Sequence, residues 1–167
     1  MVRPISCCLY HDACVRKLAL PELAVRWDAA VKPSVRDMGL MVKRLQMRHH
    51  NAANAALAEL AVSVVQWDAL RHLHENPGAS LHALAQLTFQ TDQSFGALAS
   101  RMETRGLIER VTSRGRAVRH QLTAEGERVR RAGAEIMQQV LGESFSPLSA
   151  PEQETFEKLL RKLLGAT

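Results

Sequence analysis

The chain has 167 residues, of which 46% are hydrophobic and 23% are charged, a composition typical of a globular domain and not of a disordered or collagen-like chain. No run approaches the roughly 18 apolar residues that a transmembrane helix needs, and the first residues lack the apolar run and cleavage site of a secretory signal, so we expect a cytoplasmic protein with no membrane partner. The net charge of +5 permits binding to nucleic acid but is too small to indicate it.

Residues 1–19 show no helical periodicity, and we expect them to form a disordered leader. All three cysteines lie here, so no disulfide framework can hold the rest of the chain together. Cys7, Cys8, Cys14 and His11 have the composition of a zinc site, and nearby cations could activate a thiol, but adjacent cysteines suit a closed tetrahedral site poorly. We therefore interpret the cluster as incidental and expect no metal and no cofactor.

The next three segments have the spacing of amphipathic helices. A short helix is predicted over residues 20–32, and Pro33 ends it because a proline pushes the preceding residue out of helical geometry. Ser34 can cap a longer helix that extends to residue 61 and includes an alanine-rich stretch suited to close packing. A third helix stops at the breaker Asn76-Pro77-Gly78, and its apolar residues are Val64, Trp67, Leu70 and Leu73.

Two shorter helices follow, and each is preceded by a hydroxyl residue that can cap its first turn. Ser80 precedes a helix whose inward residues are expected to be Leu81, Leu84, Ala85 and Leu87. Thr91 precedes a helix that Arg105-Gly106 ends, with an inward stripe of Phe95, Leu98 and Met102. The outward face of this helix is then made of Asp92, Gln93, Ser94, Ala97, Ser100, Arg101 and Thr104. Short polar residues at the start of such a face allow a helix to approach base edges in the major groove of DNA.

After this helix the hydrophobic period becomes that of strands. Two short antiparallel strands around a glycine-containing tip are predicted from Leu107, Ile108 and Val111 and then Ala117, Val118, His120 and Leu122. Residues 101–119 contain six arginines and no lysine against two glutamates, so this segment holds +4 of the net charge. A basic hairpin without a partner is the alternative, but its place after three helices favours contact with phosphates and the narrow minor groove.

The chain is predicted to end in two helices. Thr123 can cap a long one, with an apolar face of Val129, Ala132, Ile136 and Val140. Ser149 and Glu152 form a capping box before the last one, with an apolar stripe of Phe156, Leu159, Leu160, Leu163 and Leu164. The expected fold class is therefore mainly α with a small two-stranded β-hairpin.

Five blocks of sequence carry more specific information: Gln66–Leu70, Asn76–Gly78, Leu84–Leu87, Arg101–Arg110 and Leu122–Gly126. In residues and spacing they resemble the MarR family of winged helix-turn-helix transcriptional regulators. The resemblance implies a winged helix-turn-helix DNA-binding domain over 62–123 and dimerisation helices over 34–61 and 124–167. It further implies a homodimer that binds a pseudo-palindromic double-stranded operator, usually as a repressor, and that a small aromatic or anionic ligand releases.

The resemblance also assigns DNA-contact positions. The recognition-helix positions correspond to Gln93, Ser94, Ala97 and Arg101, and the wing positions to Arg114 and Arg116. The wing departs from the family pattern, which usually reads Asp-x-Arg, because Arg114 stands at the Asp position and the hairpin is shorter. The expected wing is therefore more positive, with an arginine that lacks the usual orienting carboxylate.

Urate-responsive members of the family offer a narrower similarity. Trp27, Asp68 and Arg110 match three of their ligand positions, but Leu98 stands where a recognition-helix arginine would be, which removes a cation that an anion needs. Another aromatic or phenolic ligand is the alternative, with Arg44, His49, Trp67 and His72 as candidate lining residues. The predicted ligand-binding residues are Trp27, Arg44, Trp67, Asp68 and Arg110.

For three of these residues, a structural role is an alternative to ligand binding. A large aromatic on an apolar helix stripe usually packs in the core, which is the interpretation we favour for Trp67. Asp68 is expected more readily as a solvated carboxylate or part of a salt bridge than as a ligand group. Arg110 is common in the wider family, where it serves structure or DNA contact.

Two other function classes are alternatives to a DNA-binding regulator. The sequence has no glycine-rich phosphate loop, no Gly-x-Ser-x-Gly elbow and no His-Glu-x-x-His motif, so we expect no enzyme. A helical dimeric scaffold that binds a protein and not DNA remains open, since the shortened wing would permit it.

Overall fold

The structure is a computed structural model that describes residues 34–111 and 118–165. Backbone contacts divide the chain into residues 1–45 and 46–167, and the boundary falls within the first helix, α1 (Val35–Leu57). The predicted leader (1–19), the predicted helix over 20–32 and the wing tip with Arg114 and Arg116 lie outside the described residues.

The predicted helix from residue 34 is present as α1 and a short 3-10 turn, η2 (Ala58–Leu60). Ser34 caps it as expected, because its Oγ accepts a hydrogen bond from the Asp37 amide at 3.1 Å and donates one to the Asp37 carboxylate at 2.7 Å. The prediction of a continuous helix to residue 61 is wrong only in the last turn, which tightens and ends at Ala61 in a left-handed conformation.

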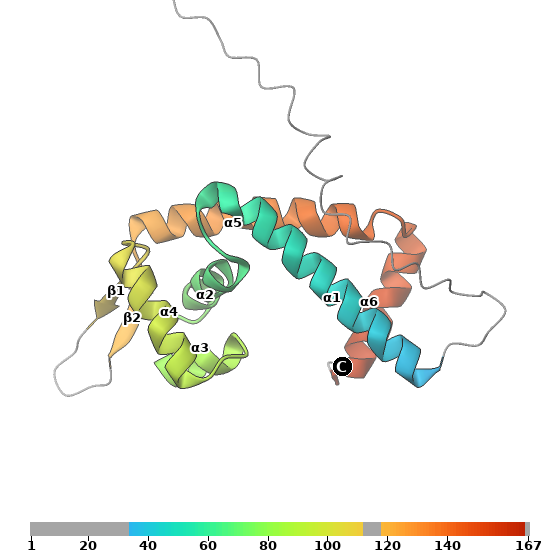
Figure 1. The fold of residues 1–167 in the computed structure, drawn as a ribbon, viewed down its shortest axis with the longest axis horizontal. Helices are drawn as coiled ribbons and strands as arrows, with labels where there is room; N and C mark the ends of the chain where they lie inside the picture. Colours follow the sequence, from blue (N-terminus) through green and yellow to red (C-terminus); the bar gives the residue numbers. More distant parts are fainter. Residues whose placement is uncertain (1–33, 112–117, 166–167) are drawn as a thin grey trace, which may run out of the picture. The chain divides into compact units, whose positions relative to one another are not determined.

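The remaining elements follow the predicted order (Figure 1). Helices α2 (Val64–Glu75), α3 (Leu81–Leu87) and α4 (Asp92–Thr104) precede the strands β1 (Ile108–Val111) and β2 (Arg119–Leu122), and the helices α5 (Ala124–Phe145) and α6 (Ala150–Leu164) follow. Side-chain oxygens of Ser63, Ser80, Thr91 and Thr123 accept hydrogen bonds from backbone amides in the first turns of α2, α3, α4 and α5. Of the described helices, none combines the length and the apolar character needed to cross a bilayer.

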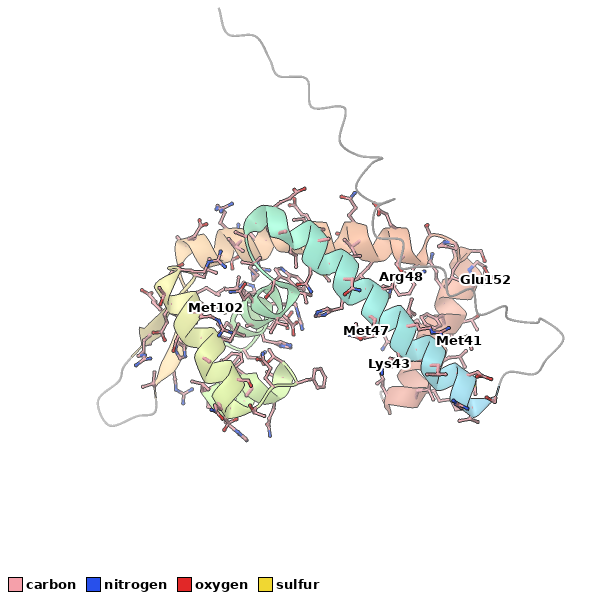
Figure 2. All side chains as sticks on the ribbon, in the orientation of Figure 1. Met41, Lys43, Met47, Arg48, Met102 and Glu152 are labelled. Atoms are coloured by element: carbon pink, nitrogen blue, oxygen red, sulfur yellow. The ribbon has the colours of Figure 1, made fainter. Side chains whose placement is uncertain are left out.

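One hydrophobic core is formed by helices α2, α3, α4 and α5, the two strands and the end of α1. It includes Leu57, Trp67, Leu70, Leu84, Phe95, Leu98, Met102, Ile108 and Val129. Burial of each large apolar side chain stabilises the fold by roughly 1.5–3 kcal/mol, and the positions follow the predicted stripes of α2, α4 and α5. Met102, labelled on α4 in Figure 2, is among the most deeply buried of these side chains.

The prediction that Leu87 points inward is wrong, since 38% of this residue is exposed. Successive residues of a helix are rotated by about 100°, so Thr88 lies closer to the face of Leu84 than Leu87 does. Thr88 is buried, and its hydroxyl donates a hydrogen bond to the Leu84 carbonyl at 2.8 Å. A polar residue with a satisfied hydroxyl therefore takes the inward position that the hydrophobic pattern assigned to a leucine.

Trp67 packs against α5 in the core, as the structural alternative predicted. Its indole Nε1 donates a hydrogen bond to the Arg130 carbonyl at 3.1 Å. The ring lies so close to Gly133 that a Cβ at this position would be 2.2 Å from the Trp67 Cδ1 atom. The glycine in α5 is thus what allows the indole to fit.

The two strands form an antiparallel hairpin with Ile108 opposite Leu122 and Val111 opposite Arg119. The left-handed conformation of Gly106 (φ 67°) turns the chain from α4 into β1. An additional bridge between Ser80 and Arg119 ties the hairpin to the start of α3. The bridge therefore holds the hairpin to the residue that precedes α3 at the end of the ladder farthest from α4.

Helix α6 begins with the predicted capping box, in which the Glu152 carboxylate (labelled in Figure 2) accepts hydrogen bonds from the amide and hydroxyl of Ser149 at 2.8 and 2.7 Å. Phe156 contacts Phe145 at the end of α5, with 6.0 Å between ring centroids. The other apolar residues of α6 are exposed in the single chain: Leu159, Leu160, Leu163 and Leu164.

Candidate nucleic-acid interface

Helix α4 presents a polar face to solvent. Thr91 fixes its first turn, because the Thr91 Oγ1 atom accepts a hydrogen bond from the Ser94 amide at 3.2 Å and donates one to the Ser94 hydroxyl at 3.0 Å. The buried stripe on the opposite side turns the predicted outward residues toward solvent, and all of them are exposed: Asp92, Gln93, Ser94, Ala97, Ser100, Arg101 and Thr104. The four predicted recognition-helix residues therefore share one accessible face.

Arg101 is the cation of this face. In residues 34–111 and 118–165 its guanidinium has no hydrogen bond or ion pair, and the side chain extends from an exposed position. The neighbouring hydroxyls are already engaged, since Ser100 donates to the Gly96 carbonyl at 3.1 Å and Thr104 to the Ser100 carbonyl at 2.9 Å. Arg101 is thus available for a phosphate or a base edge, while these two hydroxyls mainly satisfy the helix backbone.

The start of α4 is also linked to α3. An oxygen of the Asp92 carboxylate lies 2.9 Å from His82 Nδ1, and both side chains are well exposed. Such an exposed pair contributes little to stability. It does place an imidazole beside the carboxylate that begins the polar face.

A buried histidine joins α4 to the hairpin, a contact that sequence reasoning missed. His120 Nε2 on β2 lies 2.6 Å from a carboxylate oxygen of Glu103 on α4, and the His120 side chain is only 2% exposed. Arg110 on β1 approaches the same carboxylate at 3.4 Å. Burial opposes ionisation of Glu103, but the hydrogen bond from His120 and the charge of Arg110 outweigh it and hold the pKa of this carboxyl below its usual value. We call Glu103, Arg110 and His120 the hairpin clamp.

Comparison with known proteins decides the family. A family model described as the MarR family matches residues 62–117. The transcriptional regulator HosA of Escherichia coli is 37% identical over 104 residues, which span 60% of this chain and 76% of HosA. The chain belongs to the MarR family. In the winged-helix fold of this family, α4 corresponds to the recognition helix and the β1–β2 hairpin to the wing.

A second MarR relative is similar over a longer stretch. The transcriptional repressor Rv2887 of Mycobacterium tuberculosis is 27% identical over 128 residues, which span 75% of this chain and 92% of Rv2887. The solved structure of Rv2887 in complex with salicylic acid has a TM-score of 0.65 at 26% identity and covers 81% of this chain and 98% of that one. The similarity therefore extends beyond the winged helix to the flanking helices.

The six arginines of residues 101–119 do not have equivalent surroundings. Arg101 and Arg105 are exposed on and just after α4, Arg110 belongs to the hairpin clamp, and Arg119 begins β2 opposite Val111. Arg114 and Arg116, the predicted wing contacts, lie outside the described residues. Part of the basic charge that the sequence assigned to DNA contact is thus paired within the fold at Arg110.

The predicted ligand-binding residues have separate surroundings. Trp67 is a core residue, and Asp68 forms the structural salt bridge that was its alternative, with 2.7 Å between its carboxylate and Arg71. Arg110 pairs with Glu103 at the wing. Arg44 lies in the first part of α1, and Trp27 lies outside the described residues. Ligand contact by these five residues remains a prediction.

The two histidines considered as further lining residues are also engaged. His49 Nε2 lies 2.7 Å from the Ser144 hydroxyl, and its ring meets Phe145 edge-on at 5.3 Å. Burial and the nearby Arg48 charge lower the pKa of His49. His72 is buried beside the Arg71 guanidinium. Over the described ranges, no group of three or more His, Cys, Asp or Glu side chains could hold a metal ion.

Proposed function

We propose that the protein is a homodimeric, sequence-specific DNA-binding repressor and that a small aromatic or anionic ligand releases it from a pseudo-palindromic operator. The observation that carries this proposal is the exposed polar face of α4, on which Arg101 has no partner in the described part of the chain. HosA is named a transcriptional regulator and Rv2887 a transcriptional repressor, which supports the same activity here. No catalytic role is part of the proposal, and the DNA partner implies a place in the cytoplasm.

Exposed apolar side chains support the homodimer. Leu159, Leu163 and Leu164 on α6 are 55%, 80% and 80% exposed, and Val35 and Val42 on α1 are 81% and 61% exposed. Apolar residues on an amphipathic helix are normally covered, and a second copy of the chain would cover them. A twofold symmetric dimer would read two half-sites one or more helical turns apart, hence the expected pseudo-palindrome.

The proposal of a small-molecule effector is supported by a relative. Rv2887 has been solved with salicylic acid bound, and we extend to this chain only the chemical class, a small aromatic acid. A urate-type ligand is a narrower version of the same hypothesis.

A binding titration with the DNA that flanks the protein's own coding region tests the proposal. We expect Arg101→Ala to weaken binding by roughly tenfold or more, since a good arginine contact to a base or phosphate contributes about 1–3 kcal/mol. The slope of log K against log salt should fall by about 0.9 if Arg101 contacts a phosphate. The matched control is Arg128→Ala, an exposed arginine on α5 that is paired with Glu125, and it should bind like the wild type.

The titration also separates the competing function class. Undetectable binding of the wild type at low salt would remove the repressor hypothesis. If such a protein still forms a stable dimer and captures a specific protein partner, the helical scaffold is the better description.

A further inference from the structure

A cleft of about 410 Å³ lies along β2 of the wing, within residues 46–167. Its walls are the end of α2, the Pro77–Gly78 turn, the strand β2 and the first turns of α5. This volume is within the range of small-molecule sites, which is roughly 300–1,000 Å³. Among the predicted ligand residues that lie in 46–167, Trp67, Asp68 and Arg110 do not line this cleft.

The cleft combines an apolar surface with a cation. Leu73, Pro77 and Leu122 supply apolar lining, and Leu73 is part of the core, so this wall is rigidly held. Arg119 supplies the cation from β2. Its Nη1 atom would lie 3.4 Å from a Cβ on Gly78, so the guanidinium lies against the turn that borders the cleft.

Arg119 differs from the neighbouring arginines in having no partner. Within residues 34–111 and 118–165, no ion pair or hydrogen bond of its guanidinium is present. By contrast, Arg130 and Arg131 lie 2.8 and 2.7 Å from the carboxylate of Glu127, the acid at the edge of the cleft. The negative charge of Glu127 is therefore already compensated, whereas the positive charge of Arg119 is not.

We propose that this cleft binds a small aromatic carboxylate, with the carboxylate on the Arg119 guanidinium and the ring against Leu73, Pro77 and Leu122. Arginine forms paired, charge-assisted hydrogen bonds with a carboxylate, and the apolar wall offers burial to the ring. A DNA phosphate is the other anion that Arg119 could meet, but a phosphate would leave the apolar wall unused. The aromatic acid accounts for both features of the cleft.

Such a ligand would act on the wing, and this role as the effector site rests on the proposed function. Arg119 is adjacent in β2 to His120, which is bonded to Glu103 on the recognition helix at 2.6 Å. A ligand that holds Arg119 against the Pro77–Gly78 turn would restrain β2 relative to α4. The wing and the recognition helix must reach the DNA together, so this restraint changes DNA affinity.

The test is a salicylate titration of the full chain without DNA, by calorimetry and by NMR of the backbone amides. We expect salicylate to bind and to shift the amide signals of Gly78 and Leu122, and the uncharged analogue benzamide to bind at least about tenfold more weakly. Arg119→Gln should weaken salicylate binding by about 10- to 100-fold. Arg128→Gln, a matched change of an exposed α5 arginine outside the cleft, should stay within about twofold of the wild type.

Several results would overturn the site. The site is refuted if Arg119→Gln and the wild type bind salicylate with equal affinity, or if the wild type does not bind salicylate at millimolar concentration. It is also refuted if the amide signals that shift are only those near Trp67. Arg119→Gln that lowers DNA affinity and salt dependence while salicylate still binds normally would instead identify Arg119 as a phosphate contact. Because the titration contains no DNA, salicylate binding in the cleft of a protein that binds no DNA would support the site and refute the repressor.

Discussion

Phe89, in the turn between α3 and α4, has an unfavourable backbone conformation and an exposed aromatic ring. Its φ of 54° is in the left-handed region that bulky residues avoid, and the residue is 98% exposed. The left-handed conformation costs a residue with a Cβ roughly 1–2 kcal/mol, whereas glycine adopts it freely. The ring gains nothing from packing in the single chain to offset this cost.

We therefore expect Phe89→Gly to raise the free energy of unfolding by about 0.5–1 kcal/mol, after subtraction of the larger entropy that glycine has in the unfolded chain. Urea denaturation followed by circular dichroism measures this change. Phe89→Ala is the control, since it removes the ring but keeps the Cβ and should change stability little. A clear loss of stability in both variants would mean instead that the ring is packed in the assembled protein.

The exposure or burial of an individual residue was predictable where its position on one face of a helix determines it. The outward residues of α4 and the core position of Trp67 follow from period and size alone. The bond between Glu103 and His120 was not predictable in this way, because it joins residues 17 apart on a helix and a strand. Which face of β2 meets α4 depends on the strand register, and a strand this short leaves the register open.

At the scale of elements, the hairpin clamp fixes the wing to the recognition helix. Glu103→Gln would keep an oxygen that can accept the hydrogen bond from the buried His120, but it would replace a charge-assisted bond with a neutral one, which costs about 1 kcal/mol. We expect this loss of stability near pH 7, measured as the free energy of unfolding in urea. Operator affinity should fall as well, if the wing must be held beside α4 to contact DNA.

The pKa of Glu103 determines how this effect changes with pH. Its folded-state pKa is below the ordinary value of 4.5, so its contribution to stability is full above pH 4.5 and is lost as the pH falls through the folded pKa. The difference between wild type and Glu103→Gln should therefore shrink in acid. Glu109→Gln is the matched control, because Glu109 lies on the exposed side of β1 and pairs with Gln121. A Glu103→Gln variant as stable as the Glu109→Gln control would contradict the clamp.

Most elements were predictable because their ends carry local signals. Ser34, Thr91, Thr123 and Ser149 each mark a helix start by a hydrogen bond within one turn, so no distant contact is needed to place it. The α3–α4 turn shows where this fails. The short helix α3 gives only two turns of pattern, and the choice between Leu87 and Thr88 for the core depends on packing against other helices.

For the whole molecule, four of the five apolar residues predicted on α6 are exposed, and Phe156 packs against Phe145. Sequence periodicity predicts that such a stripe is buried without saying whether the same chain or another copy buries it. Leu163 and Leu164 are each 80% exposed, and Leu159 is 55% exposed. The proposed homodimer is the arrangement that would remove this surface from water, so its test concerns the assembly and not the fold.

We expect Leu163→Glu to convert the dimer into monomers with unchanged helix content. A buried leucine contributes roughly 1.5–3 kcal/mol, and twofold symmetry doubles the loss, so the dimer dissociation constant should rise by at least about 100-fold. Sedimentation equilibrium measures this constant. Lys158→Glu is the control: it adds the same side chain to α6 at a position rotated by about 140° from Leu163, and it should leave the dimer intact. A wild type that is monomeric at all concentrations, or a Leu163→Glu variant that dimerises as tightly as the control, would refute the proposed dimer.

A DNA titration of the monomeric variant then tests the operator, since a protein reading two half-sites through its symmetry should lose most of its affinity when the copies separate.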